Sequence, residues 1–198
     1  MNAKFFDLKK EKQDRMINAS LQIFAENGYN HASTDDIVKN AGISKGLLFH
    51  YFESKIGVYE FIYDYCVKFF SLELSSAIDP AEEDYFKLLS QLEAAKMQTM
   101  KNYPYMFYFI STCDKETNPE ALEVIKDASD KYKEIISEVM SKADTERISA
   151  NPLKDKYLSM LEYTLNSLVE KNLRLGIFDA EKQYKENVSY IEAINKLF

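Results

Sequence analysis

The chain has 198 residues with a formal net charge of −7, and 46% of its residues are apolar. This apolar content is ample for a buried core, whereas the acidic balance argues against a generally basic nucleic-acid binder. With only 5 Gly and 4 Pro to interrupt helices, the composition suits an all-α protein.

The positive charge of the chain is concentrated near its N-terminus. Residues 1–57 carry 8 Lys and Arg against 7 Asp and Glu, a net charge of +1, while the remaining residues carry −8. Only the N-terminal part can therefore approach phosphate without long-range repulsion. We expect any contact with nucleic acid to be local and sensitive to salt.

Signals for export, membranes and metals are missing from the sequence. Cys66 and Cys113 lie in no CxxC or zinc-ligand spacing, and His31 and His50 are distant from them. We expect buried free thiols and no metal site. The N-terminus lacks the pattern of a signal peptide, and no run of about 18 apolar residues could span a membrane. A cytoplasmic protein with no membrane partner is predicted.

The first eight residues are expected to form a loose arm, and a helix is predicted from about Lys9 to Asn27. Gly28 ends this helix. Its apolar residues have nearly helical spacing: Met16, Ile17, Leu21, Phe24 and Ala25. The basic residues at its start can touch phosphates or simply form a solvated face.

Residues 33–52 predict two short helices joined by a tight turn. Ser33 can cap the first helix, and Gly42 can adopt a positive φ that ends it and turns the chain. Ser44 can cap the second helix, which extends over residues 45–52. Two helices across a short turn with Gly form a helix-turn-helix, whose second helix enters the major groove of DNA.

The residues of this stretch resemble the DNA-binding signature of TetR-type (TetR/AcrR) transcriptional regulators. The matching runs are Thr34-Asp35-Asp36-Ile37-Val38, Ala41-Gly42-Ile43-Ser44-Lys45-Gly46 and Phe49-His50-Tyr51-Phe52, followed by Ser54-Lys55. The resemblance is dense over about twenty residues. It implies a DNA-binding domain over residues 1–57 and a helical effector-binding and dimerisation domain over residues 58–198.

Physical roles can be argued for four residues at the start of the recognition helix. Gly46 has no Cβ, so the helix can lie close to DNA, and Ser44 with the free N–H groups beside it can bind a phosphate. Lys45 can reach a phosphate or a guanine edge, and Leu47 can meet a thymine methyl group. Taken singly, Ser44 can equally be a helix cap and Leu47 a core residue.

The resemblance adds further positions to this predicted DNA-binding set. It implies phosphate contacts for His50, Tyr51 and Lys55, and a backbone contact for Thr34 from the first helix of the motif. Phe49 replaces the Tyr often found in the family, so one hydroxyl is absent there. The whole predicted set is Thr34, Ser44, Lys45, Gly46, Leu47, His50, Tyr51 and Lys55.

The rest of the chain is predicted to be helical, for roughly nine helices in all. The predicted helices lie at about 55–77, 80–102, 105–110, 119–143, 152–172 and 179–197, with a polar linker over 144–151. The helix over residues 55–77 is apolar nearly all round, which is typical of a helix that is buried or bridges two bodies. We expect it to couple DNA binding to the second domain.

Aromatic and sulfur-containing residues are frequent in the second part of the chain. They can either fill a core or line an apolar cavity, and the resemblance implies an effector pocket. The predicted lining residues are Tyr59, Ile62, Tyr63, Cys66, Met97, Met100, Tyr105, Phe109 and Tyr163. No catalytic constellation or phosphate-binding loop is present, so neither an enzyme nor a bound cofactor is predicted.

The last two predicted helices can complete a monomer core by their apolar sides. The resemblance implies instead that they pair with a second copy, and a helix-turn-helix needs a dimer to read enough bases. The sequence therefore predicts a homodimeric regulator, most simply a repressor, that a small apolar or aromatic effector releases from a palindromic operator. The alternative is a DNA-binding protein whose second domain binds a protein partner and no small ligand. Activation instead of repression is also open.

Overall fold

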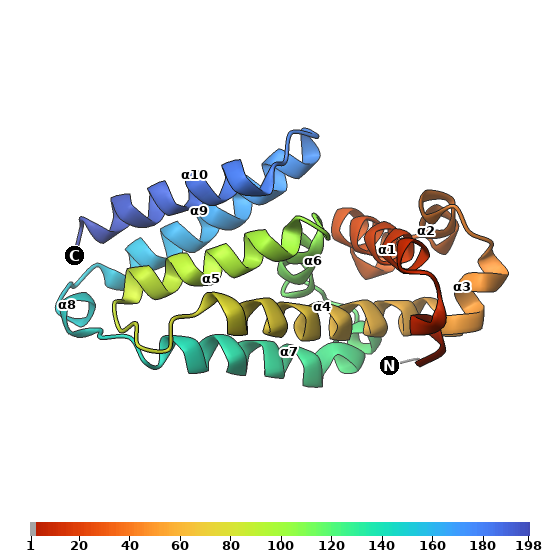
Figure 1. The fold of residues 1–198 in the computed structure, drawn as a ribbon, viewed down its shortest axis with the longest axis horizontal. Coiled ribbons are helices and arrows are strands. Elements are labelled where there is room, and N and C mark those ends of the chain that lie inside the picture. The colour runs from red at the N-terminus through yellow and green to blue at the C-terminus, as the bar shows by residue number, and fades with distance from the viewer. Residues whose placement is uncertain (1–2) are drawn as a thin grey trace. The chain divides into compact units, whose positions relative to one another are not determined.

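A computed structural model describes residues 3–198, and these residues form ten α-helices and one short 3-10 helix with no strand, which confirms the all-α prediction. The elements, labelled in Figure 1, are η1 Ala3–Asp7, α1 Lys10–His31, α2 Thr34–Ala41, α3 Lys45–Phe52, α4 Lys55–Ala77, α5 Tyr85–Met100, α6 Met106–Cys113, α7 Pro119–Met140, α8 Glu146–Ser149, α9 Lys154–Arg174 and α10 Ala180–Asn195. Within this part of the chain, no helix has both the length and the apolarity that a membrane span requires.

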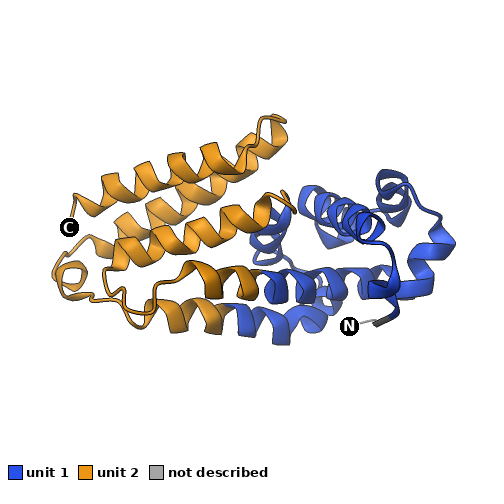
Figure 2. Ribbon diagram, in the orientation of Figure 1, with its two compact units in different colours: residues 1–69, 105–132 blue, residues 70–104, 133–198 orange. Residues whose placement is uncertain are grey.

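The helices group into two compact units (Figure 2). Unit 1 comprises residues 1–69 and 105–132, and unit 2 comprises residues 70–104 and 133–198. The boundaries between the units lie inside α4 and α7, so each unit contains part of both helices. The units thus differ from the predicted functional domains, whose boundary at residue 57 stays a prediction.

Unit 1 is built around the apolar face of α1, which packs against α2 and α6. Ile17, Leu21 and Phe24 on this face are fully buried. Gly28 interrupts the helical backbone with φ of 65° and ψ of 176°, so regular α1 geometry ends where the sequence predicted. Gly tolerates this conformation because it has no Cβ. Residues 29–33 then lead from Gly28 into α2.

The N-terminal segment is a packed part of unit 1, so the expected loose arm is wrong for residues 3–8, while Met1 and Asn2 lie outside the described residues. The Phe5 ring is fully buried, with its centroid 5.3 Å from that of Phe52 and 4.9 Å from that of Phe61. The Gln13 side chain donates hydrogen bonds of 3.1 and 2.7 Å to the carbonyls of Phe6 and Leu8. An aromatic anchor and satisfied backbone groups hold the segment in place.

Unit 2 has an apolar core and a buried chain of polar side chains. In its core, α5 packs against α10 and α10 packs against α9, and the buried apolar residues include Phe86, Ile148, Leu161, Leu165 and Ile191.

The polar chain of unit 2 starts at Glu93 on α5, which accepts hydrogen bonds from Asn187 on α10 at 2.7 Å and from Lys96 at 2.8 Å. Gln183 donates to Asn187 at 2.8 Å and accepts from Asn172 on α9 at 2.7 Å. Glu93, Asn187 and Gln183 are buried, so these hydrogen bonds replace the water that burial removes.

Two local predictions in unit 2 are wrong. Helix α5 begins at Tyr85 and not at Pro80, because the Asp84 carboxylate caps it by accepting a 2.9 Å hydrogen bond from the Lys87 N–H. Pro80 lies in the preceding turn instead. The linker expected over residues 144–151 contains the short helix α8, which contributes Ile148 to the core of unit 2.

Replacement of Phe5 tests whether the N-terminal segment is a folded part of the protein. Phe5→Ala should lower the free energy of unfolding by about 3 kcal/mol, because it leaves a cavity among buried rings. Phe6→Ala is the matched control. Phe6 is 40% exposed, so its replacement should lower the free energy of unfolding by about 1 kcal/mol or less. Urea denaturation measures both values. Equal losses in the two variants would contradict the packing of Phe5.

Candidate nucleic-acid interface

The two helices of the predicted helix-turn-helix are present, with the predicted caps. The Ser33 hydroxyl accepts a 3.2 Å hydrogen bond from the Asp35 N–H at the start of α2. Gly42 ends α2 in the left-handed conformation with φ of 63°. Ser44 then caps α3 by accepting a 3.2 Å hydrogen bond from the Leu47 N–H. Both helices therefore begin after a capping serine, and α2 ends at a glycine that suits the left-handed conformation.

Helix α3 has one buried side and one exposed side. Leu48 and Phe52 are buried in unit 1. The predicted DNA-binding residues of α3 and its cap lie outside the core: Ser44, Lys45, Gly46 and His50 are exposed, and Leu47 and Tyr51 are half-buried. Thr34 at the start of α2 is also half-buried. The start of α3 therefore presents side chains and free backbone N–H groups to the surroundings.

The Lys45 ammonium forms a 2.8 Å ion pair with the Asp35 carboxylate, which joins α2 and α3 at the surface. Both side chains are about half exposed or more, so water screens the pair and its contribution to stability is small. A phosphate group could therefore compete with Asp35 for Lys45. The orientation of Lys45 in the unbound protein is consistent with the predicted contact.

Lys55 lies differently from the other predicted residues, because its ammonium group faces the protein. It donates a 3.2 Å hydrogen bond to the Asn30 carbonyl and lies 4.6 Å from the centre of the Tyr29 ring. Burial lowers the pKa of the Lys55 ammonium, and the nearby Glu116 carboxylate opposes this effect. A phosphate contact by Lys55 would require the side chain to leave these partners.

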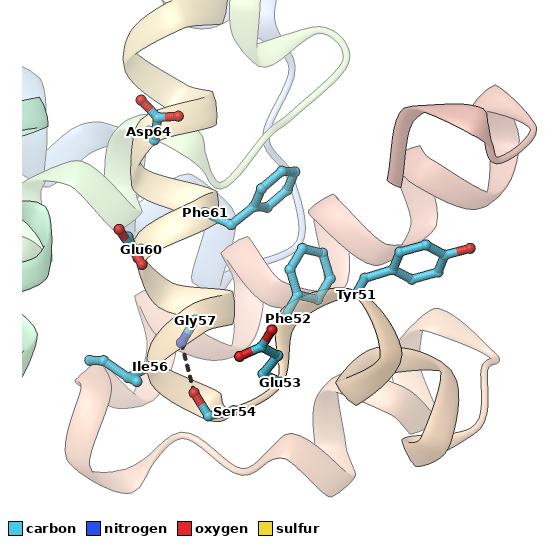
Figure 3. A pocket seen from close by; sticks show the side chains of 9 residues that line it. All are labelled: Tyr51, Phe52, Glu53, Ser54, Ile56, Gly57, Glu60, Phe61 and Asp64. Carbon is cyan, nitrogen blue, oxygen red and sulfur yellow. Dashed lines mark hydrogen bonds between the residues drawn. The ribbon is translucent and has the colours of Figure 1, made fainter. Parts of the chain in front are cut away.

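A pocket of about 460 Å³ lies at the corner between α3 and α4 (Figure 3). Its apolar wall includes Phe52 and Phe61, whose ring centroids are 4.8 Å apart. Its charged lining residues are the acids Glu53, Glu60 and Asp64. These carboxylates repel phosphate, so the electrostatics favour DNA approach at the start of α3 and not at this corner.

Sequence reasoning missed two residues that shape this corner. Glu53 follows α3 with φ of 62°, a conformation that non-glycine residues rarely adopt. A Cβ on Gly57 would collide with the Phe52 carbonyl oxygen, so α3 and α4 can meet this closely only because residue 57 is Gly. A Gly inside an otherwise apolar helix pattern is the signal that could have indicated the close approach.

The residues predicted to line an effector pocket fall into both units. In unit 1, Tyr59, Ile62, Tyr63, Cys66 and Phe109 are buried and Tyr105 is half-buried. In unit 2, Met97 and Met100 are buried. Met97 also lines a pocket of about 300 Å³ between α5 and α10, together with polar residues such as Lys101 and Tyr184.

Tyr163 is a correction to the predicted set, because its side chain is 73% exposed on α9. The buried positions of this helix are Leu161, Leu165, Val169 and Leu173, which recur every four residues. Tyr163 lies two residues after Leu161 and therefore projects from nearly the opposite side of the helix. It cannot form the wall of a buried cavity within this chain.

The Tyr59 side chain of unit 1 is buried among aromatic rings. Tyr59 donates a 3.1 Å hydrogen bond to the Cys113 sulfur, and its ring centroid lies 5.0 Å from that of Phe24 and 5.5 Å from that of Phe109. Burial raises the pKa of Tyr59, and the adjacent Cys113 raises it further. Tyr59 is therefore neutral at physiological pH.

Comparison with known proteins finds one family and several relatives of this architecture. Residues 16–60 match the family described as bacterial regulatory proteins of the tetR family. The chain is 38% identical over 48 residues to the HTH-type negative transcriptional regulator IcaR of the biofilm operon icaADBC in Staphylococcus aureus. This alignment covers 24% of the chain and 26% of that regulator.

The chain is also 26% identical over a longer stretch of 95 residues to the fatty acid metabolism regulator protein of Bacillus subtilis. It covers 48% of this chain and 45% of the relative, so the matched segments span less than half the length of both curated relatives.

A likeness to solved structures extends over nearly the whole chain. The fatty acid degradation regulator FadR from Bacillus halodurans superimposes with a TM-score of 0.60 at 19% identity, covering 90% of this chain and 96% of the other. At this identity the likeness shows the fold alone. Regulators of this family bind DNA and act as dimers. Residues 16–60 therefore form a helix-turn-helix domain of the TetR type, and the fold of the chain is that of solved TetR-family regulators.

Proposed function

We propose that the chain is a ligand-responsive repressor that binds a palindromic operator as a homodimer and leaves it when a small apolar or aromatic effector binds. The observation that carries this proposal is the start of α3. Ser44, Lys45 and Gly46 are exposed there beside the free N–H groups of a capped helix. Such a helix start attracts phosphate and leaves room for the DNA backbone.

Two relatives support repression and a metabolic signal. IcaR is a negative transcriptional regulator by its name, and the Bacillus subtilis relative regulates fatty acid metabolism. An apolar effector suits the aromatic and apolar residues buried around Tyr59 and Tyr63. The neutral tyrosine hydroxyls in this region could orient such a ligand by hydrogen bonds.

The proposed dimer uses α9 and α10, which expose large apolar residues. Met160 is 60% exposed one turn before Tyr163 on α9, and Tyr190 on α10 is also exposed. Apolar side chains on one face of adjacent helices favour association with an identical face. Two recognition helices related by twofold symmetry would then read the two halves of a palindrome.

Fluorescence anisotropy with DNA from around the protein's own gene tests the proposal directly. Measurements at two salt concentrations, with random DNA as competitor, separate specific from non-specific binding. Binding that resists the competitor would support a sequence-specific regulator. The bound fragment would then serve to test candidate effectors by release. Binding equal to that of random DNA, for every fragment tested, would count against the proposal.

Replacement of Leu47 tests which residue reads the bases. Leu47→Ala should change the preferred base at one position of each half-site, with about 1 kcal/mol less discrimination, because an apolar contact with a base is lost. Val38→Ala on α2 is the control, since Val38 is also half-buried but lies on the first helix. Selection from a randomised operator measures the preference. An unchanged preference would make Leu47 a core residue.

Replacement of Gly46 should separate stability from DNA binding. A Cβ at Gly46 meets no atom within 4 Å, so Gly46→Ala should raise the free energy of unfolding by about 0.5 to 1 kcal/mol. The same Cβ should weaken operator binding about tenfold, because it would lie between α3 and DNA. Gly57→Ala provides the contrast, since its Cβ would collide with the Phe52 carbonyl oxygen and should lower both the free energy of unfolding and the operator affinity. Unchanged operator affinity in Gly46→Ala would place DNA elsewhere.

Replacement of Tyr163 tests the dimer face. Tyr163→Glu should raise the dimer dissociation constant about 100-fold, because a charge would be buried in the apolar centre of the interface. Leu72→Glu is the control, since Leu72 is 70% exposed on α4 and should leave association unchanged. Sedimentation equilibrium measures both constants. A Tyr163→Glu protein that dimerises like the wild type would exclude α9 from the interface.

A further inference from the structure

The turn between α6 and α7 contacts the end of α1 through the Glu116 side chain. One carboxylate oxygen, Oε2, accepts a 3.1 Å hydrogen bond from the Tyr29 N–H, across 87 residues of sequence. The other, Oε1, accepts from the N–H groups of Thr117 and Asn118 at 2.8 and 2.9 Å. Glu116 therefore closes its own turn and also holds the backbone that leads from α1 into α2.

A second side chain of the same turn strengthens this contact. The Asn118 amide Nδ2 donates a 2.7 Å hydrogen bond to Oδ1 of Asn30, while its own Oδ1 accepts from the Ala121 N–H and caps α7. The Asn30 carbonyl in turn accepts the hydrogen bond from Lys55, the first residue of α4. The α6–α7 turn, the α1–α2 connection and the start of α4 thus form one hydrogen-bonded junction within unit 1.

The charges at this junction stabilise one another. Desolvation alone would raise the pKa of Glu116, but hydrogen bonds from the N–H groups of Asn118, Tyr29 and Thr117, with the charge of Lys55, lower it overall. Glu116 is therefore an anion at physiological pH, and its charge favours the charged form of Lys55. The Lys55 ammonium group contacts both the Asn30 carbonyl and the Tyr29 ring.

The place of the junction in the chain gives it a mechanical role. Gly28 departs from helical backbone geometry immediately before Tyr29, although the Ala32 N–H still donates a 3.2 Å hydrogen bond to the Gly28 carbonyl. Glu116 and Asn118 supply further partners for Tyr29 and Asn30. These two residues lie on the connection to α2, and α2 packs against the recognition helix α3.

We propose that Glu116 is a positioning residue for DNA binding, and that it holds the helix-turn-helix by fixing Tyr29, Asn30 and Lys55 from the α6–α7 turn. This proposal rests on the proposed function, and it assigns Lys55 to the protein interior and not to a phosphate. The α6–α7 turn then connects the effector-binding part of the chain to the helix-turn-helix by a second route besides α4. A change in α6 or α7 would alter how firmly α2 and α3 are held.

The sign of one substitution distinguishes this role from simple electrostatics. The protein has a net charge of −7, so removal of any carboxylate should slightly strengthen its attraction to DNA. If Glu116 positions the helix-turn-helix, its removal should instead weaken DNA binding, because α2 and α3 lose a fixed orientation. The two explanations therefore predict opposite changes in affinity.

The test measures operator affinity of the full-length protein by anisotropy at several salt concentrations. Glu116→Ala should weaken operator binding about tenfold, which is within the range of couplings carried by hydrogen-bonded networks. Glu116→Gln keeps the shape of the side chain and one of its two acceptor oxygens, so it should recover part of the loss. Glu123→Ala, an exposed carboxylate further along α7, is the control and should bind as well as the wild type or slightly better.

Lys55→Met tests the other end of the junction. It should lower affinity without changing the slope of log affinity against log salt, because no phosphate contact is lost. A slope that falls by about 0.9 would show that Lys55 contacts a phosphate and would overturn its assignment to the interior. The double variant with Glu116→Ala should lose little more affinity than either single variant, since both break the same junction. Additive losses would overturn the proposal.

Hydrogen exchange keeps the test independent of the DNA ligand. In Glu116→Ala, the peptide that contains the Tyr29 amide should exchange faster than in the wild type or in Glu123→Ala. Unchanged exchange would overturn the proposal, as would unchanged or stronger operator binding by Glu116→Ala. If wild-type protein binds no operator while the exchange difference is present, the proposed function fails but the junction stands.

Discussion

The packing of Tyr59 between α1 and α6 is the interaction on which unit 1 depends. Its ring contacts Phe24 and Tyr29 of α1 and Phe109 of α6, with centroid distances of 5.0, 5.1 and 5.5 Å. Its hydroxyl is satisfied by Cys113, so the side chain can be fully buried without an unpaired donor. One residue of α4 thereby contacts both α1, which precedes the helix-turn-helix, and α6.

The parts of the fold that sequence patterns predicted are those set by local chemistry. Ser33, Gly42 and Ser44 act within three or four residues of themselves, so their caps and turns could be recognised without tertiary structure. The predicted start at Pro80 failed for the same local reason, because the better cap, Asp84, lies four residues further along. Helix type and order were predictable, whereas the start of α5 depended on which residue caps it, and the short helix α8 was not recognised in a polar segment.

The parts that could not be predicted join residues far apart in sequence. Phe5 is an anchor only because α3 and α4 place rings around it, and Glu116 meets Tyr29 only after α6 has packed on α1. The effector set shows the same limit. Aromatic and sulfur content singled out Tyr59 and Phe109, but composition alone does not distinguish a packed core from a cavity. It also failed for Tyr163, which lies away from the buried positions of α9.

The buried chain from Glu93 to Asn172 has a consequence for how unit 2 can move. Its hydrogen bonds join particular pairs of side chains, so a slip of α10 by one turn along α5 would separate Glu93 from Asn187. Apolar side chains between the two helices would tolerate such a slip far better, because one apolar contact can replace another. These hydrogen bonds therefore favour one register between α5 and α10. In a twofold assembly any displacement of this pair of helices would occur once in each subunit, and the twofold axis would relate the two displacements.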